Sequence, residues 1–526
     1  MMRRVGRQSQ GRFVPAARVV AILFLSVLAS ACSPADQDSA TQQAQRPSTP
    51  LRRGLGADPA TLDPQLAEDN AAIAVAADLY EGMTTEAPDG SIIPGAARSW
   101  SIDDIGLTYL FSLRPGLRWS NGDPLAAEDF VAGLRSALAP GSVAPSARLL
   151  EAVESVDAID PVTVRIRLSR PAPKLPALLA LPVAAPLHPR AAALQPRPGN
   201  GAYRVVRRVP GERIELERNP HYRDAANVAI ERVIHLAITD LTTELNLYRA
   251  GDLDLTSEVP NTQLESLRRE HPAELRVAPY LSTYAYQVNL ARLPDAGARN
   301  ALAMAVDRAR ITRQVTGAGE RPAFGWVPDG IPGYAPARFE WQDLAYPQAA
   351  ARARGLWQAA AAAGKAPTKI KLCTDASANH HRTAVALADL WRTALGVETE
   401  IVELEWNVYL DTRHNPGDCD LVRLGWSADF VDPEAFAAVF ESGNPQNTLG
   451  YHSAAYDGLL AKSRTETDNA RRMALLARAE QQLLTEVPVI PVFFRASKRL
   501  VKPYVAGYQA NPLGHVASRD LRFNGR

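Results

Sequence analysis

The chain has 526 residues, of which 22% are charged and 46% are hydrophobic, and its formal net charge is +1. Because the charges nearly cancel, the protein has no global field toward nucleic acid or acidic surfaces, and we expect no nucleic-acid partner. Beyond residue 32, no apolar stretch reaches the roughly 18 residues that a membrane helix needs. The remaining length is enough for two or three domains.

The N-terminal segment has the pattern of a secretory signal peptide. A cationic start precedes a mostly apolar run at residues 19–28, and small residues then lead to Cys32. The segment resembles a bacterial lipobox, although Ala29 stands where leucine is usual. We expect residues 1–31 to be the signal peptide, Cys32 to carry lipid chains that anchor the protein to the membrane in the periplasm, and residues 32–50 to form a flexible tether. A soluble periplasmic protein is the alternative.

Only two other cysteines are present, Cys373 and Cys419. Neither has the spacing of a metal site, and we expect no metal and no other cofactor. An oxidising compartment permits a disulfide between them. However, Cys373 is expected to end one strand and Cys419 to begin another, which in a parallel sheet places them at opposite edges. This placement does not favour a disulfide.

In the first half of the chain, strands and turns dominate the predicted elements. Residues 51–56, 108–113 and 162–168 have strand patterns, whereas residues 70–82 and 128–138 have helical spacing. Asn121 and Gly122 predict a hairpin turn, because both residue types accept positive φ. The proline-rich residues 171–198 predict irregular structure or short helices. Strands are expected again at residues 202–217 and 228–238, followed by helices at 242–250 and 260–270.

From residue 299 the pattern changes to alternating strands and helices. Predicted strands cover residues 369–373, 397–402 and 420–425, and predicted helices cover residues 300–306, 382–395 and 406–413. Alternation of this kind predicts a mostly parallel sheet with right-handed crossovers. Two last strands, at residues 489–494 and 500–501, can return the chain to the first domain.

A candidate ligand-binding carboxylate follows one of these strands. Asp429 lies just beyond the carboxyl end of the strand at residues 420–425, where ligands bind in open parallel sheets. Asp432 is the expected N-cap of a helix that begins with Pro433. Capping explains Asp432 and leaves Asp429 able to hold an ammonium group. A second capping or surface aspartate is the alternative interpretation.

Seven motifs occur in an order that is specific to one family. They are DPATLDP at residues 58–64, LYEG at 79–82, RWSNGDP at 118–124, NGAY at 200–203, ELERNPHY at 215–222, YRAGDLD at 248–254 and GWSAD at 425–429. Over essentially its whole mature length, the chain resembles the oligopeptide-binding proteins of bacterial peptide importers, in family 5 of the bacterial extracellular solute-binding proteins.

This resemblance implies an α/β fold with three domains, a class II periplasmic binding protein that closes on its ligand about a hinge. Domain I would contain residues 51–83, 201–280 and 496–526, and domain III residues 281–495. Domain II would be a β-rich insertion at residues 84–200.

The implied function is that of a monomeric binding protein, not an enzyme, which captures short peptides and delivers them to the permease and ATPase of an ABC importer. The sequence contains no nucleophile elbow and no phosphate loop that would favour an enzyme. The alternatives are the same fold binding murein tripeptide or another small solute, or a peptide-sensing role without transport.

The resemblance also implies a role for each site residue. Asp429 would bind the α-ammonium of the peptide, and the backbone of Gly425, Trp426 and Ser427 would pair with the peptide as an added strand. The peptide carboxylate would be bound, depending on peptide length, by Arg423, His380 or Arg413. A helix cap at His380 and a surface ion pair at Arg413 are the alternatives. Family members often have a disulfide at the positions of Ser282 and Ser427, so this site should be less constrained.

Overall fold

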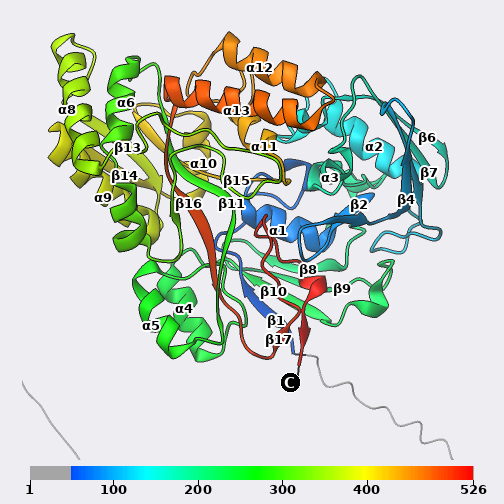
Figure 1. The fold of residues 1–526 in the computed structure, drawn as a ribbon. Coiled ribbons are helices and arrows are strands. Elements are labelled where there is room, and N and C mark those ends of the chain that lie inside the picture. Colours follow the sequence, from blue (N-terminus) through cyan, green and yellow to red (C-terminus); the bar gives the residue numbers. More distant parts are fainter. Residues whose placement is uncertain (1–48, 525–526) are drawn as a thin grey trace, which may run out of the picture. The chain divides into compact units, whose positions relative to one another are not determined.

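The computed structural model describes residues 49–524, so the predicted signal peptide, Cys32 and nearly all of the predicted tether lie outside the described residues. Within residues 49–524 the chain forms a mixed α/β fold with one six-stranded and two four-stranded sheets (Figure 1). No helix in this part of the chain is long and apolar enough to cross a membrane.

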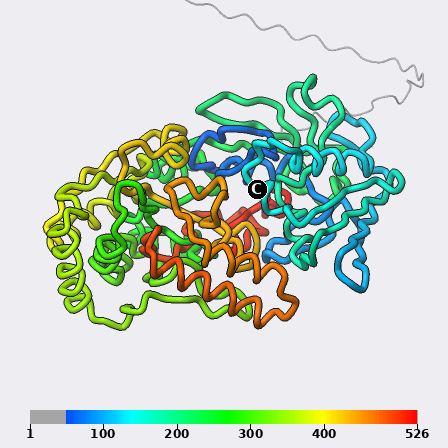
Figure 2. The backbone as a smooth tube through the Cα atoms, turned by 90° about the horizontal axis from the view of Figure 1, so that it is seen from above, coloured from blue at the N-terminus to red at the C-terminus, as the bar shows by residue number. Residues whose placement is uncertain are grey.

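The first four-stranded sheet joins distant parts of the chain. Its strands, in spatial order, are β1 (Leu51–Gly54), β10 (Arg232–Leu236), β9 (Arg213–Arg218) and β8 (Tyr203–Val209). Arg53 Nη1 donates to Ser518 Oγ at 2.8 Å, and the Ser518 N–H donates to Asp78 Oδ1 at 2.9 Å. The C-terminal segment therefore lies beside the start of the described chain (Figure 2).

The second four-stranded sheet is built from one continuous segment. Its strands, in spatial order, are β4 (Ala97–Ile102), β5 (Thr108–Leu113), β7 (Thr163–Leu168) and β6 (Val153–Asp160). Helix α2 (Ala127–Leu138) packs on β6 and β7 and buries Phe130. The predicted strand at 108–113 and helix at 128–138 are confirmed. Gly122 has φ 88° as expected, but its turn closes only an isolated bridge between Arg118 and Pro124.

The six-stranded sheet is the frame of the remaining part. Its strands, in spatial order, are β12 (Arg321–Pro322), β16 (Val489–Leu500), β11 (Leu275–Val288), β15 (Leu421–Ser427), β13 (Lys369–Asp375) and β14 (Glu398–Leu404). Only β15–β13 and β13–β14 are parallel; the other three pairings are antiparallel. The expectation of a mostly parallel sheet was wrong, because the long strand β11 was missed and β16 was taken as two short strands.

Helices and short strands complete the fold. The helices are α1 (Asn70–Leu79), α3 (Leu175–Leu178), α4 (Leu241–Ala250), α5 (Leu264–Glu270), α6 (Ala296–Met304), α7 (Arg308–Arg310), α8 (Tyr346–Ala362), α9 (Ala378–Leu395), α10 (Trp406–His414), α11 (Glu434–Ala437), α12 (Ala454–Thr465) and α13 (Asn469–Glu486). The short strands are β2 (Thr84–Glu86), β3 (Ile92–Pro94), β17 (Val505–Ala506) and β18 (Arg522–Phe523). Helix α9 ends at Gly396, as predicted, with φ 74°.

The β11–β16 ladder is interrupted in its middle. Residues 275–279 pair with residues 496–500, and after a bulge residues 283–287 pair with residues 489–494. At the bulge, residues 280–282 lie opposite the single residue Arg495. Bulges bend a strand and increase its twist. This bend coincides with the expected limits of domains I and III, although the domain boundaries themselves stay a prediction.

Cys373 and Cys419 form a disulfide with a Cα–Cα distance of 5.9 Å, so the expectation that they stay apart was wrong. Strand β13 continues beyond Cys373 to Asp375, and Cys373 is aligned with Val422 near the start of β15. Cys419 lies two residues before that start. The staggered register of two adjacent parallel strands therefore brings both sulfur atoms to the same place.

Candidate functional site

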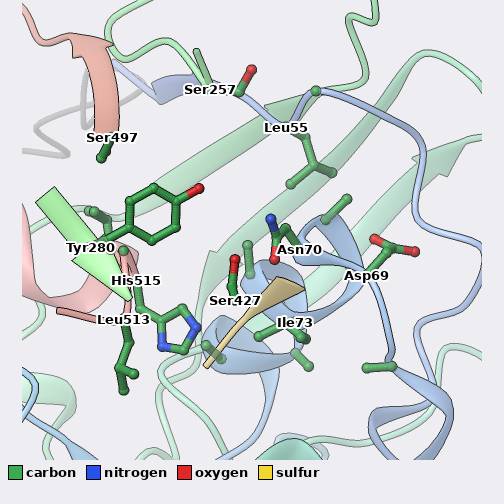
Figure 3. Close-up of a pocket in the computed structure, with 18 of the residues that line it drawn as sticks. Leu55, Asp69, Asn70, Ile73, Ser257, Tyr280, Ser427, Ser497, Leu513 and His515 are labelled. Atoms are coloured by element: carbon green, nitrogen blue, oxygen red, sulfur yellow. The ribbon is translucent and has the colours of Figure 1, made fainter. Parts of the chain in front are cut away.

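A cavity of ≈ 530 Å³ is lined by segments that are far apart in the sequence. Figure 3 shows side chains around it that come from the N-terminal segment, the end of β15 and the C-terminal segment, among them Asn70, Ser427 and His515. The volume is typical of a site for a small ligand. Of the seven residues that the sequence predicted to bind peptide, the lining includes six: Asp429, Arg423, Arg413, His380, Gly425 and Ser427.

Strand β15 presents backbone groups to this cavity. The Ala428 N–H donates to Leu281 O at 2.8 Å, and the antiparallel β11–β15 ladder continues from there without a shift. Because hydrogen-bonding direction alternates along a strand, the N–H and C=O groups of Gly425 and Ser427 point away from β11.

On that other side, β13 pairs with β15 only as far as Val422. Tyr409 Oη donates to the Arg423 carbonyl at 2.8 Å and so occupies the next outward-facing group. In residues 49–524 no strand pairs with β15 beyond that point on this side. The backbone of Gly425 and Ser427 therefore forms an open edge that can accept an extended ligand.

Trp426 is the predicted residue that the cavity lining does not include. Its side chain points to the opposite face of β15, where Nε1 donates to Ala435 O at 2.7 Å. The indole also lines a smaller neighbouring pocket of ≈ 60 Å³, which shares Asp429 with the main cavity. The side chain of Trp426 thus fixes the start of α11 relative to β15.

Asp429 lies two residues beyond the end of β15, half-buried in the cavity wall. Within residues 49–524 its carboxylate forms no hydrogen bond and no ion pair. Burial raises the pKa of Asp429 to about 6, and the nearby His515 opposes this shift only in part. Asp432, in contrast, accepts a hydrogen bond from the Glu434 N–H at 2.8 Å. Helix α11 begins at Glu434 with Pro433 as its N-cap, so the predicted N-cap at Asp432 was one residue too early. Asp429 is therefore the carboxylate that is able to receive a cation.

Arg423 and His380 share a carboxylate that sequence reasoning missed. Arg423 Nε lies 2.6 Å from Asp375 Oδ1, and His380 Nδ1 lies 2.9 Å from the same carboxyl group. Burial would raise the pKa of Asp375, but the charge of Arg423 and the contact with His380 outweigh it and hold that pKa below its usual range. Asp375 is the last residue of β13 and lines the cavity. Its position at the carboxyl end of a strand is the feature of the sequence that could have identified it as a site residue.

His380 has a fixed acidic partner in this arrangement, and its role toward the peptide carboxylate stays a prediction. Burial lowers the pKa of His380, and the positive charges of Arg423 and Arg495 oppose the raising effect of Asp375. His380 is therefore mainly neutral at neutral pH and fixes Asp375, instead of being a free cation. The guanidinium of Arg423 is also held between partners, since the ring centre of Tyr409 lies 4.7 Å from its central carbon.

Arg413 lies in the last turn of α10. Its Nη2 donates to Gln446 Oε1 at 2.8 Å. Its neighbour His414 lies 3.7 Å from Glu68, a residue of the N-terminal part of the chain. The polar contact with His414 is the main cause that lowers the pKa of Glu68, while burial opposes it. Arg413 is thus placed where the C-terminal end of α10 meets the segment that precedes α1.

Ser282 and Ser427 lie directly opposite each other in the β11–β15 ladder. Their hydroxyl groups form a hydrogen bond at 3.0 Å. The two positions at which the family resemblance implied a disulfide are therefore joined by a weaker, non-covalent contact. The site keeps its geometry there without a covalent cross-link.

Solved structures of similar proteins share this fold. The complex of Haemophilus influenzae OppA with the peptide RPPGFSPFR is 31% identical, covers 91% of this chain and 99% of its own, and has a TM-score of 0.86. The unliganded open form of MppA, a periplasmic murein tripeptide-binding protein, is 30% identical over 91% of this chain and 98% of its own, with a TM-score of only 0.66. The present structure is closer to the peptide complex, and the expected fold class is confirmed.

Sequence comparison leads to the same family. The periplasmic oligopeptide-binding protein OppA of Escherichia coli is 34% identical over 501 residues, which cover 90% of this chain and 92% of that protein. The family model for the middle region of the bacterial extracellular solute-binding proteins, family 5, matches residues 91–448. The chain therefore belongs to the family 5 bacterial extracellular solute-binding proteins.

Proposed function

We propose that this chain captures short peptides in the periplasm and delivers them to the permease and ATPase of an ABC importer. The observation that carries the proposal is the Asp429 carboxylate, which has no hydrogen-bond or ion-pair partner among residues 49–524 and lies beside the open edge of β15. A peptide added along this edge would bind the backbone of Gly425 and Ser427 and bring its α-ammonium to Asp429. The name of the E. coli relative supports this class of ligand.

The cellular setting of the proposal comes from the sequence. The protein would act as a monomer, without enzymatic activity, held in the cell envelope by lipid chains on Cys32. Murein tripeptide is an alternative ligand, since it also carries a free amine, and a sensing role without transport is an alternative use of the same site. Native mass spectrometry of the purified protein would identify a co-purified ligand.

The test of the peptide assignment is the substitution Asp429→Asn. If the carboxylate pairs with the α-ammonium in the closed cavity, its removal leaves a buried charge without a partner. Such a loss costs about 3–5 kcal/mol, or roughly two to three orders of magnitude in affinity. Calorimetric titration should show this weakening for a free tripeptide. An N-acetylated tripeptide should already bind the wild type weakly, and the substitution should change its affinity little.

Asp432→Asn is a matched control, because Asp432 lies three residues further along the chain and pairs with Arg472 at 2.8 Å instead of lining the cavity. This variant should bind the free tripeptide as the wild type does. The two proteins and two peptides together give a double-mutant cycle. A coupling energy near zero between Asp429 and the peptide amine would contradict the proposed function.

A further inference from the structure

Two guanidinium groups converge over Gly425 at the cavity wall. A Cβ atom built on Gly425 would lie 2.8 Å from Arg423 Nη1 and 3.7 Å from Arg495 Nη1. Arg423 belongs to β15, whereas Arg495 belongs to β16 and occupies the bulge of the β11–β16 ladder. Both arginines line the cavity. The lack of a side chain on Gly425 therefore leaves the space in which the two positive charges face each other.

The two arginines have different acidic partners, and both of these partners also line the cavity. Arg423 pairs with Asp375 at 2.6 Å. Arg495 has Glu258 at 3.9 Å, but Glu258 lies closer to Lys498, at 3.4 Å. In the described part of the chain, no carboxylate lies within ion-pair distance of both arginines.

Arg495 has weaker contacts with neighbouring side chains than Arg423 has. Within residues 49–524 its guanidinium forms no hydrogen bond, and its side chain is 20% exposed. Its central carbon lies 5.7 Å from the ring centre of Tyr280, a contact that orients the guanidinium without using its donors. The planar set of N–H donors is therefore available to an anion in the cavity.

We propose that Arg495 and Arg423 together bind a carboxylate of the ligand above Gly425. A carboxylate there would separate the two like charges and accept hydrogen bonds from both, which is the geometry that guanidinium groups favour. This inference rests on the proposed function, since it assigns the second charged end of the same ligand. It also gives Arg495 a recognition role that the sequence did not predict for it.

The position of the arginine pair indicates a short ligand. Gly425 precedes Asp429 by four residues, which span at most about 13 Å at roughly 3.3 Å per extended residue, and the chain bends at Asp429. A tri- or tetrapeptide with its amine at Asp429 would place its terminal carboxylate near the two arginines. An acidic side chain of a longer peptide presents the same chemical group, so the test has to separate these two sources.

The test uses Arg495→Gln and calorimetric titration with four ligands: trialanine, trialanine with a C-terminal amide, Ala-Glu-Ala amide and Ala-Gln-Ala amide. If the terminal carboxylate is bound, the substitution weakens trialanine about 10- to 100-fold, the usual range for one charge-assisted contact, and leaves its amide unchanged. If a side-chain carboxylate is bound, only Ala-Glu-Ala amide loses affinity. Either pattern supports a carboxylate site at Arg495.

Arg276→Gln is the control, because Arg276 is an exposed arginine on the neighbouring strand β11 that does not line the cavity. It removes the same charge and should leave all four affinities unchanged. Arg495→Lys, which keeps the charge but not the planar donors, should recover only part of the affinity. An Arg495→Gln variant that keeps the wild-type melting temperature and all four affinities would overturn the inference. So would equal losses for acids and amides.

These outcomes are distinct from a failure of the proposed function. If trialanine binds the wild type and depends on Asp429 but not on Arg495, the peptide assignment stands and the carboxylate site is wrong. If none of the four ligands binds the wild type, both proposals are wrong.

Discussion

Single residues give the cavity two chemically different ends. At one end Asp429 is half-buried without an ionic partner among residues 49–524, so an incoming ammonium group would gain a strong charge-assisted contact. At the other end the charge of Arg423 is already balanced by Asp375. A further anion there depends on Arg495, whose acidic neighbour Glu258 lies 3.9 Å away and closer to Lys498. This asymmetry favours a ligand whose amine contributes more to affinity than its carboxylate.

The pKa of Asp429 leads to a prediction for pH dependence. Burial raises this pKa to about 6 in the free protein, and an ammonium ligand binds only the ionised carboxylate. Affinity for a free tripeptide should therefore be nearly constant from pH 7 to 7.5. It should fall below pH 6, by up to tenfold per pH unit. Burial would lower the pKa of His515, but its hydrogen bond with Glu86 raises that pKa above its ordinary value. Protonation of His515 also weakens peptide binding at low pH, because it adds a cation that competes with the peptide ammonium.

Titration calorimetry between pH 5 and pH 7.5 measures this dependence. Asp429→Asn should bind the free tripeptide weakly at every pH in this range. Its affinity should not show the fall below pH 6 that protonation of Asp429 causes in the wild type. His515→Gln should keep that decrease, with its midpoint moved upward, because it removes the positive charge that lowers the pKa of Asp429. A decrease of the same size in Asp429→Asn and in the wild type would contradict the role of this carboxylate.

Among the structural elements, β15 is the one that positions the site. It pairs with β11 along its whole length but with β13 only at its first two residues, so its second half provides an open edge. The disulfide between Cys373 and Cys419 joins β13 to the start of β15 and closes a loop of 46 residues. This cross-link lies just before Asp375 and Arg423 in their respective strands, and it thereby limits movement between the two residues that form the buried ion pair.

We predict that the double substitution Cys373→Ser and Cys419→Ser lowers the free energy of unfolding by about 2–4 kcal/mol. The reason is that the open chain has more conformational freedom when unfolded. Denaturant unfolding with and without a reducing agent measures the effect, and the variant should be insensitive to reductant. Peptide affinity should change little, because the strand pairing around the site remains. Identical unfolding of the oxidised wild type and the double variant would contradict the prediction.

In the whole molecule, ion pairs join parts that are distant in the sequence, and most of their residues line the smaller pocket beside the cavity. Lys174 pairs with Glu434, Arg148 with Glu441 at 2.8 Å, and Glu151 with Arg464 at 3.3 Å. These contacts connect the segment expected to be domain II with the segment expected to be domain III. Together with the greater similarity to a peptide complex than to an open form, they indicate a closed arrangement.

A ligand that contacts both sides of the cavity favours the closed state, since only that state provides all of its contacts. We therefore predict that the wild type becomes more compact when a saturating tri- or tetrapeptide is added. Small-angle X-ray scattering should show a smaller radius of gyration. Asp429→Asn at the same peptide concentration should remain near the unliganded value. An unchanged radius of gyration in the wild type, with binding confirmed by calorimetry, would contradict closure by a hinge.

Sequence alone predicted those features that depend on local patterns. The strand at residues 108–113 and the helix at 382–395 follow from side-chain periodicity, because burial of one face is encoded within a few residues. The family follows from the order of short motifs. The placement of Asp429 beyond a buried strand was also predictable, since the position of a strand end is a local property.

Tertiary structure alone decided which distant residues meet. Strand β11 pairs with β15 and β16, which lie more than 100 residues away in the sequence. The side-chain pattern of a single strand does not show which other strands it pairs with. The register of β13 against β15 brought the two cysteines together, and Arg495, which lies opposite the bulge of β11, was placed beside Arg423. These contacts depend on register and strand order, which are set by packing across the whole sheet rather than by neighbouring residues.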